Sequence, residues 1–163
     1  MTHEPRLTRE LRDLLHTQRI AALGTLGDDG APLVSMVPFA IEPGAGVVVI
    51  HVSELAAHTH NLQVSPAVSL LVIRAEQPGE PVHALARVTL NGRAMVQDGD
   101  TPEGQACRAA YLARFPEAEP MTELGDFRFV AIEVTTARQV AGFGSARSLD
   151  ADTIRQVLSD VRG

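Results

Sequence analysis

The chain has 163 residues, of which 45% are hydrophobic, and its formal net charge is −6 at pH 7. This length suits one domain, and the negative charge disfavours nucleic acids and anionic membranes as partners. All 14 basic residues are arginine, which excludes chemistry that requires lysine, such as a Schiff base. Cys107 is the only cysteine, so no intramolecular disulfide can form. No run reaches the roughly 18 apolar residues of a membrane span, and we expect a soluble, cytoplasmic protein.

The N-terminal third predicts one helix followed by a β-hairpin. Leucines at helical spacing indicate an amphipathic helix over about residues 8–17, with Thr8 as its N-cap. Two strand-like runs, 19–25 and 33–40, flank Gly27-Asp28-Asp29-Gly30. Because an Asp-Gly step favours a tight turn, these runs are expected to pair as a hairpin.

The middle of the chain predicts a strand, a helix and another strand. Residues 47–52 form a β-branched run typical of a buried strand. Ser53 follows and is placed to cap a helix over 54–63, which Pro66 separates from an apolar strand over 68–73.

The remaining sequence predicts three more strands and two helices. These elements are a strand over 84–96, a helix from Thr101 to Phe115, strands over 127–134 and 137–142, and a final helix over 150–162. Asn91-Gly92 indicates a bulge or bend within the first of these strands. Thr101, with proline next, and Asp150 are suited to capping their helices.

Strands dominate this order, and helices separate only some of them, which disfavours a parallel doubly wound sheet. The sequence therefore predicts a mainly β fold of α+β type: a six- to seven-stranded antiparallel barrel with peripheral helices. One domain would occupy residues 1–163, with the barrel over about 19–144.

The segment from His51 to Leu71 carries the strongest chemical signal. Ser53 would sit at a helix N-terminus, whose free N–H groups favour a phosphate. His58, Asn61 and Leu62 are spaced i, i+3 and i+4 and share a helix face. These residues could surround a phosphate, or they could be an ordinary serine cap and an exposed histidine.

Several motifs of this chain resemble the FMN-binding split barrels of the pyridoxamine-phosphate-oxidase-like superfamily. Asn61-Leu62, Pro66 and the strand after it fit that family's helix-strand pattern, although His58 stands where the family has a phosphate-binding lysine. The variant S-E-L-A-x-H-T-x-N-L, beginning at Ser53, is similar to the haem-utilisation branch of the superfamily.

Two further segments share the resemblance, which covers residues 8–145. The run from Gly30 to Phe39 is similar to the family's first hairpin, whose second strand passes beside the flavin ring, and Arg87 starts a segment similar to the strand that supplies an arginine to the flavin. The resemblance implies a split barrel that acts as a homodimer, with its cofactor between the subunits. The cofactor-binding residues that it implies are Ser35, Met36, Val37, Pro38, Ser53, His58, Thr59, Asn61, Leu62 and Arg87.

Physical reasoning leaves alternatives open at two of these positions. Arg87 stays charged and therefore needs an anion, a carbonyl or solvent, so it could face a flavin or simply point outward. His58 and His60 could suggest a metal, but residues i and i+2 of a helix face different sides and no Asp, Glu or Cys cluster completes a site. No metal is expected.

The sequence supports three functions, in decreasing order of support. The first is an FMN-dependent oxidoreductase or FMN carrier of unknown substrate, with catalytic residues unassigned. Pyridoxamine phosphate oxidase itself is disfavoured, because its C-terminal Arg-x-His motif is missing and no histidine follows His83. The second is a haem-binding or haem-degrading protein, although the C-terminal axial histidine of haem-degrading relatives is also absent. The third is a non-catalytic ligand-binding protein on the same scaffold.

Overall fold

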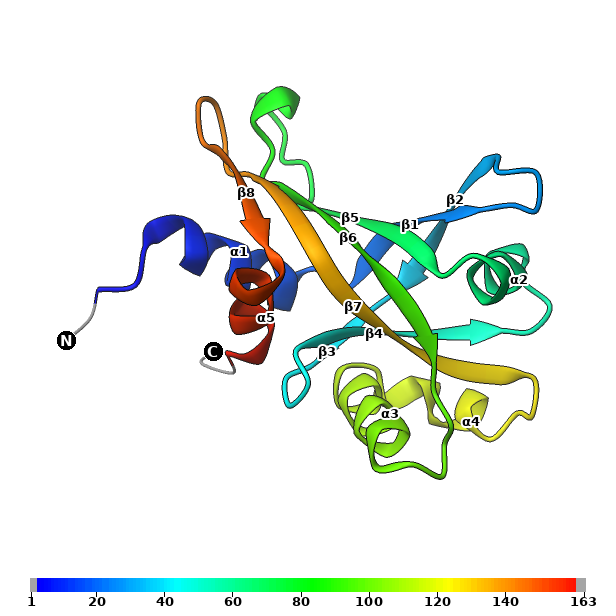
Figure 1. Ribbon diagram of the computed structural model, residues 1–163. Helices are drawn as coiled ribbons and strands as arrows, with labels where there is room; N and C mark the ends of the chain where they lie inside the picture. Colours follow the sequence, from blue (N-terminus) through cyan, green and yellow to red (C-terminus); the bar gives the residue numbers. More distant parts are fainter. Residues whose placement is uncertain (1–2, 161–163) are drawn as a thin grey trace.

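Eight strands form one antiparallel sheet in the computed structural model, which describes residues 3–160. The strand order is β2-β1-β5-β6-β7-β4-β3, and β8 pairs with β7 beyond this path. The strands are β1 (Ile20–Leu26), β2 (Pro32–Pro38), β3 (Ala40–Glu42), β4 (Val47–Ser53), β5 (Ala67–Ile73), β6 (Arg87–Val96), β7 (Phe127–Val140) and β8 (Ala146–Asp150). The sheet curls into a split barrel (Figure 1). The antiparallel split barrel predicted from the sequence is confirmed. Its sheet has eight strands, whereas six to seven were predicted.

The barrel interior is built by the alternating side chains of its strands. In β4, Val48, Ile50 and Val52 point into the main core and are almost fully buried. β1 and β5 alternate in the same way, with Leu23 and Leu70 directly paired and buried. A period of two residues places one face of each strand inside, so these runs fold as strands.

The opposite face of β4 is also covered. Val47 and Val49 belong to a second apolar cluster with Cys107 and Tyr111 of helix α3 (Pro102–Arg114) and with Phe115, which follows that helix. Because helix α3 packs against this face, Val47 and Val49 are also shielded from water.

Seven helical segments surround the sheet within residues 3–160. They are α1 (Arg6–Thr17), α2 (Ala57–Val64), η1 (Val82–Ala84), α3 (Pro102–Arg114), η2 (Pro116–Ala118), α4 (Glu119–Thr122) and α5 (Ala151–Ser159). Two predicted caps are confirmed: Thr101 Oγ1 accepts the Gly104 N–H at 3.1 Å, and Asp150 Oδ1 accepts the Thr153 N–H at 2.8 Å. No helix within the described range is both long and apolar enough to span a membrane.

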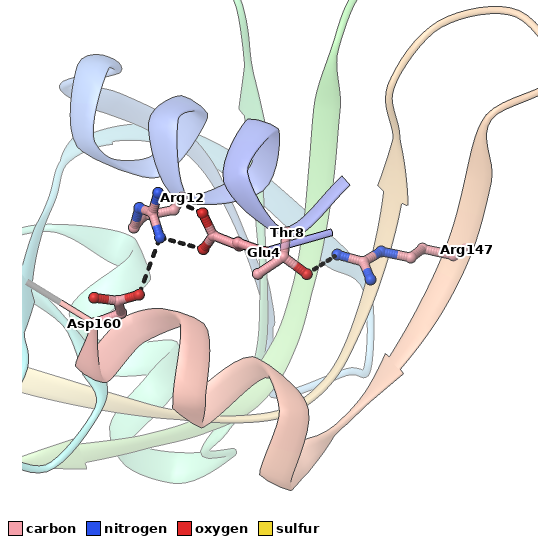
Figure 2. A network of polar contacts seen from close by, with 5 residues as sticks. All are labelled: Glu4, Thr8, Arg12, Arg147 and Asp160. Atoms are coloured by element: carbon pink, nitrogen blue, oxygen red, sulfur yellow. Dashed lines mark hydrogen bonds and ion pairs between the residues drawn. The ribbon is translucent and has the colours of Figure 1, made fainter. Parts of the chain in front are cut away.

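The two terminal helices are joined by buried charge. Arg12 is only 8% exposed, and its guanidinium binds the Glu4 carboxylate and lies 3.0 Å from an Asp160 oxygen (Figure 2). Arg147 of β8 donates to the Thr8 hydroxyl at 3.3 Å. These contacts tie α1 to α5 and to the last strand.

Several predicted boundaries were wrong. α1 begins at Arg6 after Pro5, so Thr8 lies inside the helix instead of capping it. The strands expected over 127–134 and 137–142 are one strand, β7, which pairs with both β4 and β6. The final helix begins at Ala151 and ends at Ser159, while 161–163 lie outside the described residues. β8 was missed because Leu149 is its only buried residue, which leaves a weak strand pattern.

Candidate functional site

Two residues of the predicted cofactor site whose side chains meet are Ser35 of β2 and His58 of α2. The Ser35 hydroxyl oxygen lies 2.9 Å from Nδ1 of His58. α2 packs against β1, the strand paired with β2, and this packing brings the helix to the hairpin. A serine and a histidine that the resemblance placed separately therefore form one hydrogen-bonded pair.

The environment of His58 favours a neutral ring. Partial burial lowers the pKa of His58 because desolvation disfavours the charged form. With its proton on Nδ1, the imidazole donates to the Ser35 hydroxyl and keeps the Nε2 lone pair open. A hydrogen bond on one ring nitrogen that frees the other is the usual arrangement of a metal-ligating histidine.

The serine expected to cap α2 has another role. α2 begins at Ala57, its N-cap is Ala56, and no side chain caps it. Ser53 is still in β4, paired with Phe127, and its hydroxyl accepts the Leu55 N–H at 3.2 Å. The predicted cap was wrong because the chain turns for three residues between the strand and the helix.

The other predicted residues on α2 hold the helix in place. The Thr59 hydroxyl donates to the Ser53 carbonyl at 2.5 Å, and the Asn61 amide donates to the Thr25 hydroxyl at 3.0 Å. Thr59, Asn61 and Leu62 are all buried, and Leu62 lies in the main core. Their side chains anchor α2 to the barrel.

β2 divides the four hairpin residues between two faces. Val37 is 2% exposed and packs in the barrel core, while Met36, on the other face, is 62% exposed. Pro38 ends the strand and pairs with Ile20. Of this run, Ser35 is the residue that forms a hydrogen bond with His58.

Arg87 does not join this pair. It starts β6 opposite Ile73, whereas α2 leads into the other end of β5, at Ala67. The two ends of that strand are about 20 Å apart at roughly 3.3 Å per residue. The guanidinium of Arg87 instead donates to the backbone carbonyls of Leu85 at 2.9 Å and His83 at 3.3 Å.

The outer face of β1, β2 and β5 is apolar and open. Val34, Met36 and Ile20 are 69%, 62% and 55% exposed, and cross-strand pairing places them on one face. Their neighbours Ala22 and Gly24 are small, which leaves this part of the sheet smooth. An exposed apolar patch of this kind is typical of an interaction surface.

Sequence reasoning gave no role to His51, which lines a cavity of about 790 Å³. The residue interrupts the valine-rich strand β4 and is 9% exposed. A histidine inside a β-branched run was the available signal, but only the fold shows that the ring borders a cavity.

Cys107 is packed as its alanine-rich surroundings predicted. The residue is 3% exposed, and burial, together with the charge of Glu42, raises the pKa of its thiol to about 11. It is therefore a poor nucleophile at neutral pH. Within residues 3–160, no group of three or more His, Cys, Asp or Glu side chains is placed to hold a metal ion.

Comparison with known proteins places these features in context. The pyridoxamine 5'-phosphate oxidase family matches residues 7–141. The non-canonical heme oxygenase HOZ of Arabidopsis thaliana is 35% identical over 88% of this chain, and the heme oxygenase HutZ of Vibrio cholerae is 28% identical over 91%. A heme binding protein from Mycobacterium smegmatis superposes with a TM-score of 0.83 at 30% identity over 94% of this chain. The chain spans 44% of the Arabidopsis protein, 84% of HutZ and 62% of the mycobacterial chain.

Proposed function

Because the chain belongs to the pyridoxamine 5'-phosphate oxidase family, we propose that it is a haem-binding protein of that family, with His58 as the iron ligand. The observation that carries this proposal is the 2.9 Å contact between Ser35 and Nδ1 of His58. It orients a neutral imidazole and leaves Nε2 without a hydrogen bond among the described residues. Haem iron is commonly held by such a histidine.

The charge state of His58 and the position of Arg87 argue against a flavin phosphate beside α2. A phosphate needs positive charge or several free N–H donors. Partial burial disfavours the protonated form of His58, so the ring brings no positive charge to a phosphate. Arg87 is occupied by backbone carbonyls at the far end of its strand. The groups present in one protomer therefore suit a metal-bound ring better than an anionic group.

The comparisons support the same choice. Two curated relatives are named as heme oxygenases, and a solved relative is named as a heme binding protein. Two of these proteins are substantially longer than this chain, so haem cleavage is a separate proposal that binding alone does not establish.

A homodimer is the second part of the proposal. The exposed apolar face around Val34 and Met36 offers a surface that a second copy would cover. Arg87 and α2 lie at opposite ends of β5, so any ligand that contacts both would require residues from two chains. We expect the mass in solution to be that of two chains, and a Val34→Glu/Met36→Glu variant to be monomeric.

A haemin titration followed by absorbance tests the haem proposal. The native chain is expected to saturate and to show the spectrum of a histidine-ligated haem. His58→Ala should change that spectrum and weaken binding by about tenfold or more, by comparison with the cost of disturbing metal-ligand surroundings. His60→Ala is the matched control, because His60 is exposed on the same helix and contacts Asp28 at 3.1 Å.

Parallel titration with FMN decides between this proposal and a flavoprotein. Saturable FMN binding without haem binding would overturn the haem proposal and favour the FMN-dependent oxidoreductase. Binding of neither ligand would favour a non-catalytic protein on the same scaffold. If haem binds, loss of its absorbance under a reductant and oxygen would support cleavage.

A further inference from the structure

A second site candidate lies between the sheet and helices α3 and α4. α3 and α4 pack beside β7 on the lower side of Figure 1. The cavity there has a volume of about 790 Å³, and its lining includes His51, Asp98, Asp100, Phe127 and Phe129. None of these residues has a part in the proposed haem site.

His51 is held in a cluster of aromatic rings. It pairs with Phe129 across the β4–β7 ladder, and the two ring centres lie 4.4 Å apart. Phe127 stacks at 5.0 Å, and Tyr111 of α3 lies at 5.6 Å. These contacts fix the ring in one orientation while it borders the cavity.

The polar atoms of this ring have no partner within residues 3–160. Nδ1 is closed off from solvent and makes no hydrogen bond. Nε2 also makes no hydrogen bond, but it is not closed off from solvent. Nε2 is therefore the ring nitrogen at the open edge of His51. Burial lowers the pKa of His51, which keeps the ring neutral near pH 7. With its proton on Nδ1, the neutral ring presents the Nε2 lone pair at the cavity as a free hydrogen-bond acceptor.

Around the cavity, the arginines have ion-pair partners, whereas two of the aspartates have none among the described residues. Arg108 lies 3.5 Å from Glu123, and Arg128 lies 3.4 Å from Glu54. The carboxylates of Asp98 and Asp100 have no ion-pair partner among the described residues, although Asp98 accepts the Asp100 N–H at 2.9 Å. After these pairings, the lining presents two unneutralised negative charges.

We propose that this cavity binds a small planar organic cation that carries N–H donors, such as an amidine or an aromatic amine. Its donors would face the open edge of His51 and the carboxylates of Asp98 and Asp100. Its flat, apolar part would lie against Phe127 and Phe129, whose ring faces attract positive charge. An anion of the same shape would meet the two unpaired carboxylates and be repelled.

Calorimetric titration with three probes of one shape tests the proposal. Benzamidine is a cation with N–H donors, benzamide is neutral, and benzoate is an anion. We expect saturable binding of benzamidine, weaker binding of benzamide by about tenfold, and no binding of benzoate. Asp98→Asn/Asp100→Asn removes both negative charges and should weaken benzamidine binding by about tenfold or more, which corresponds to at least about 1.4 kcal/mol.

A second variant tests the imidazole itself. His51→Phe keeps an aromatic ring in the cluster and removes the nitrogen acceptor, so benzamidine binding should weaken while the unfolding midpoint changes little. If the variant unfolds, the aspartate variant, which alters the cavity wall, still decides the question. Tighter binding of benzoate than of benzamidine would overturn the proposal, as would benzamidine affinity that neither variant changes. Haemin binding should be unaffected by either variant, so the two proposals fail separately.

Discussion

Ser35 and His58 are 23 residues apart in the sequence, yet the serine hydroxyl and Nδ1 of the imidazole lie at 2.9 Å. The contact joins the edge strand β2 to helix α2, and both elements are anchored by β1. It therefore depends on the packing of three elements. The pair fixes the orientation of the one α2 histidine that is partly shielded from solvent.

Removing the serine hydroxyl is expected to weaken haem binding without removing the iron ligand. Ser35→Ala frees the His58 ring, and loss of such an outer hydrogen bond typically costs about 10–100-fold in metal affinity. Haemin titration measures the change. Ser69→Ala is the control, because its hydroxyl bonds Asn91 at 2.8 Å on the exposed side of the sheet. Equal affinity of the native chain and Ser35→Ala would show that the pair does not orient a ligand.

Loss of the buried amide on α2 is expected to destabilise the fold. Asn61→Ala leaves the Thr25 hydroxyl, 2% exposed, without its donor at 3.0 Å. Leaving a buried polar group unpaired costs about 1–3 kcal/mol in the free energy of unfolding, measurable by urea denaturation. Asn91→Ala, at an exposed amide, should cost much less. Similar losses for both variants would contradict a special role for the buried pair.

The bulge of β6 is expected to require glycine. The register between β6 and β7 shifts at Asn91/Gly92, and a Cβ on Gly92 would lie 2.4 Å from the Glu133 carbonyl oxygen. Because the obstacle is backbone, relief requires movement of the central strand. Gly92→Ala should lower the free energy of unfolding by about 1–3 kcal/mol, the range for overpacking. Gly125→Ala is the control, since nothing lies within 4 Å of its added Cβ.

The cap of α5 is expected to make stability depend on pH. The Thr153 backbone N–H lowers the pKa of Asp150 below its ordinary value. A carboxyl with a depressed folded pKa contributes stability above the unfolded value of about 4, and this contribution is lost as pH falls through the folded pKa. Native chain and Asp150→Asn should therefore differ in unfolding midpoint near pH 6 and converge near pH 2. A difference that does not change with pH would show that the charge contributes nothing.

Much of the fold follows from local sequence. Strand-like apolar runs identified β1, β2, β4, β5 and β6, because a strand buried on one face requires an apolar residue at every second position and a strand buried on both faces requires a continuous apolar run. Thr101 and Asp150 identified two helix starts, since their side chains satisfy N–H groups within their own turn. The bulge at Asn91-Gly92 was also predicted locally, because an Asn-Gly step inside a strand-like run indicates a bulge or bend.

The start of α2 could not be decided in this way. Ser53 has the chemistry of a cap, but pairing with Phe127 keeps it in β4, so the helix begins only at Ala57. β8 depends equally on its neighbour, since its few apolar side chains are ordered by pairing with β7. Long-range hydrogen bonds outweigh local preference at both positions.

The sequence by itself determined which residues could carry chemistry, including Ser35, His58 and Arg87. Only the tertiary structure decided that the first two touch, and that Arg87 lies at the far end of its strand. It also enclosed His51 between β7 and Tyr111, a residue of α3 far along the chain. The physical reason is that the chemistry of a side chain is set by its own residue type. The distance between two side chains, their burial and their protonation depend on which distant segments the sheet brings together.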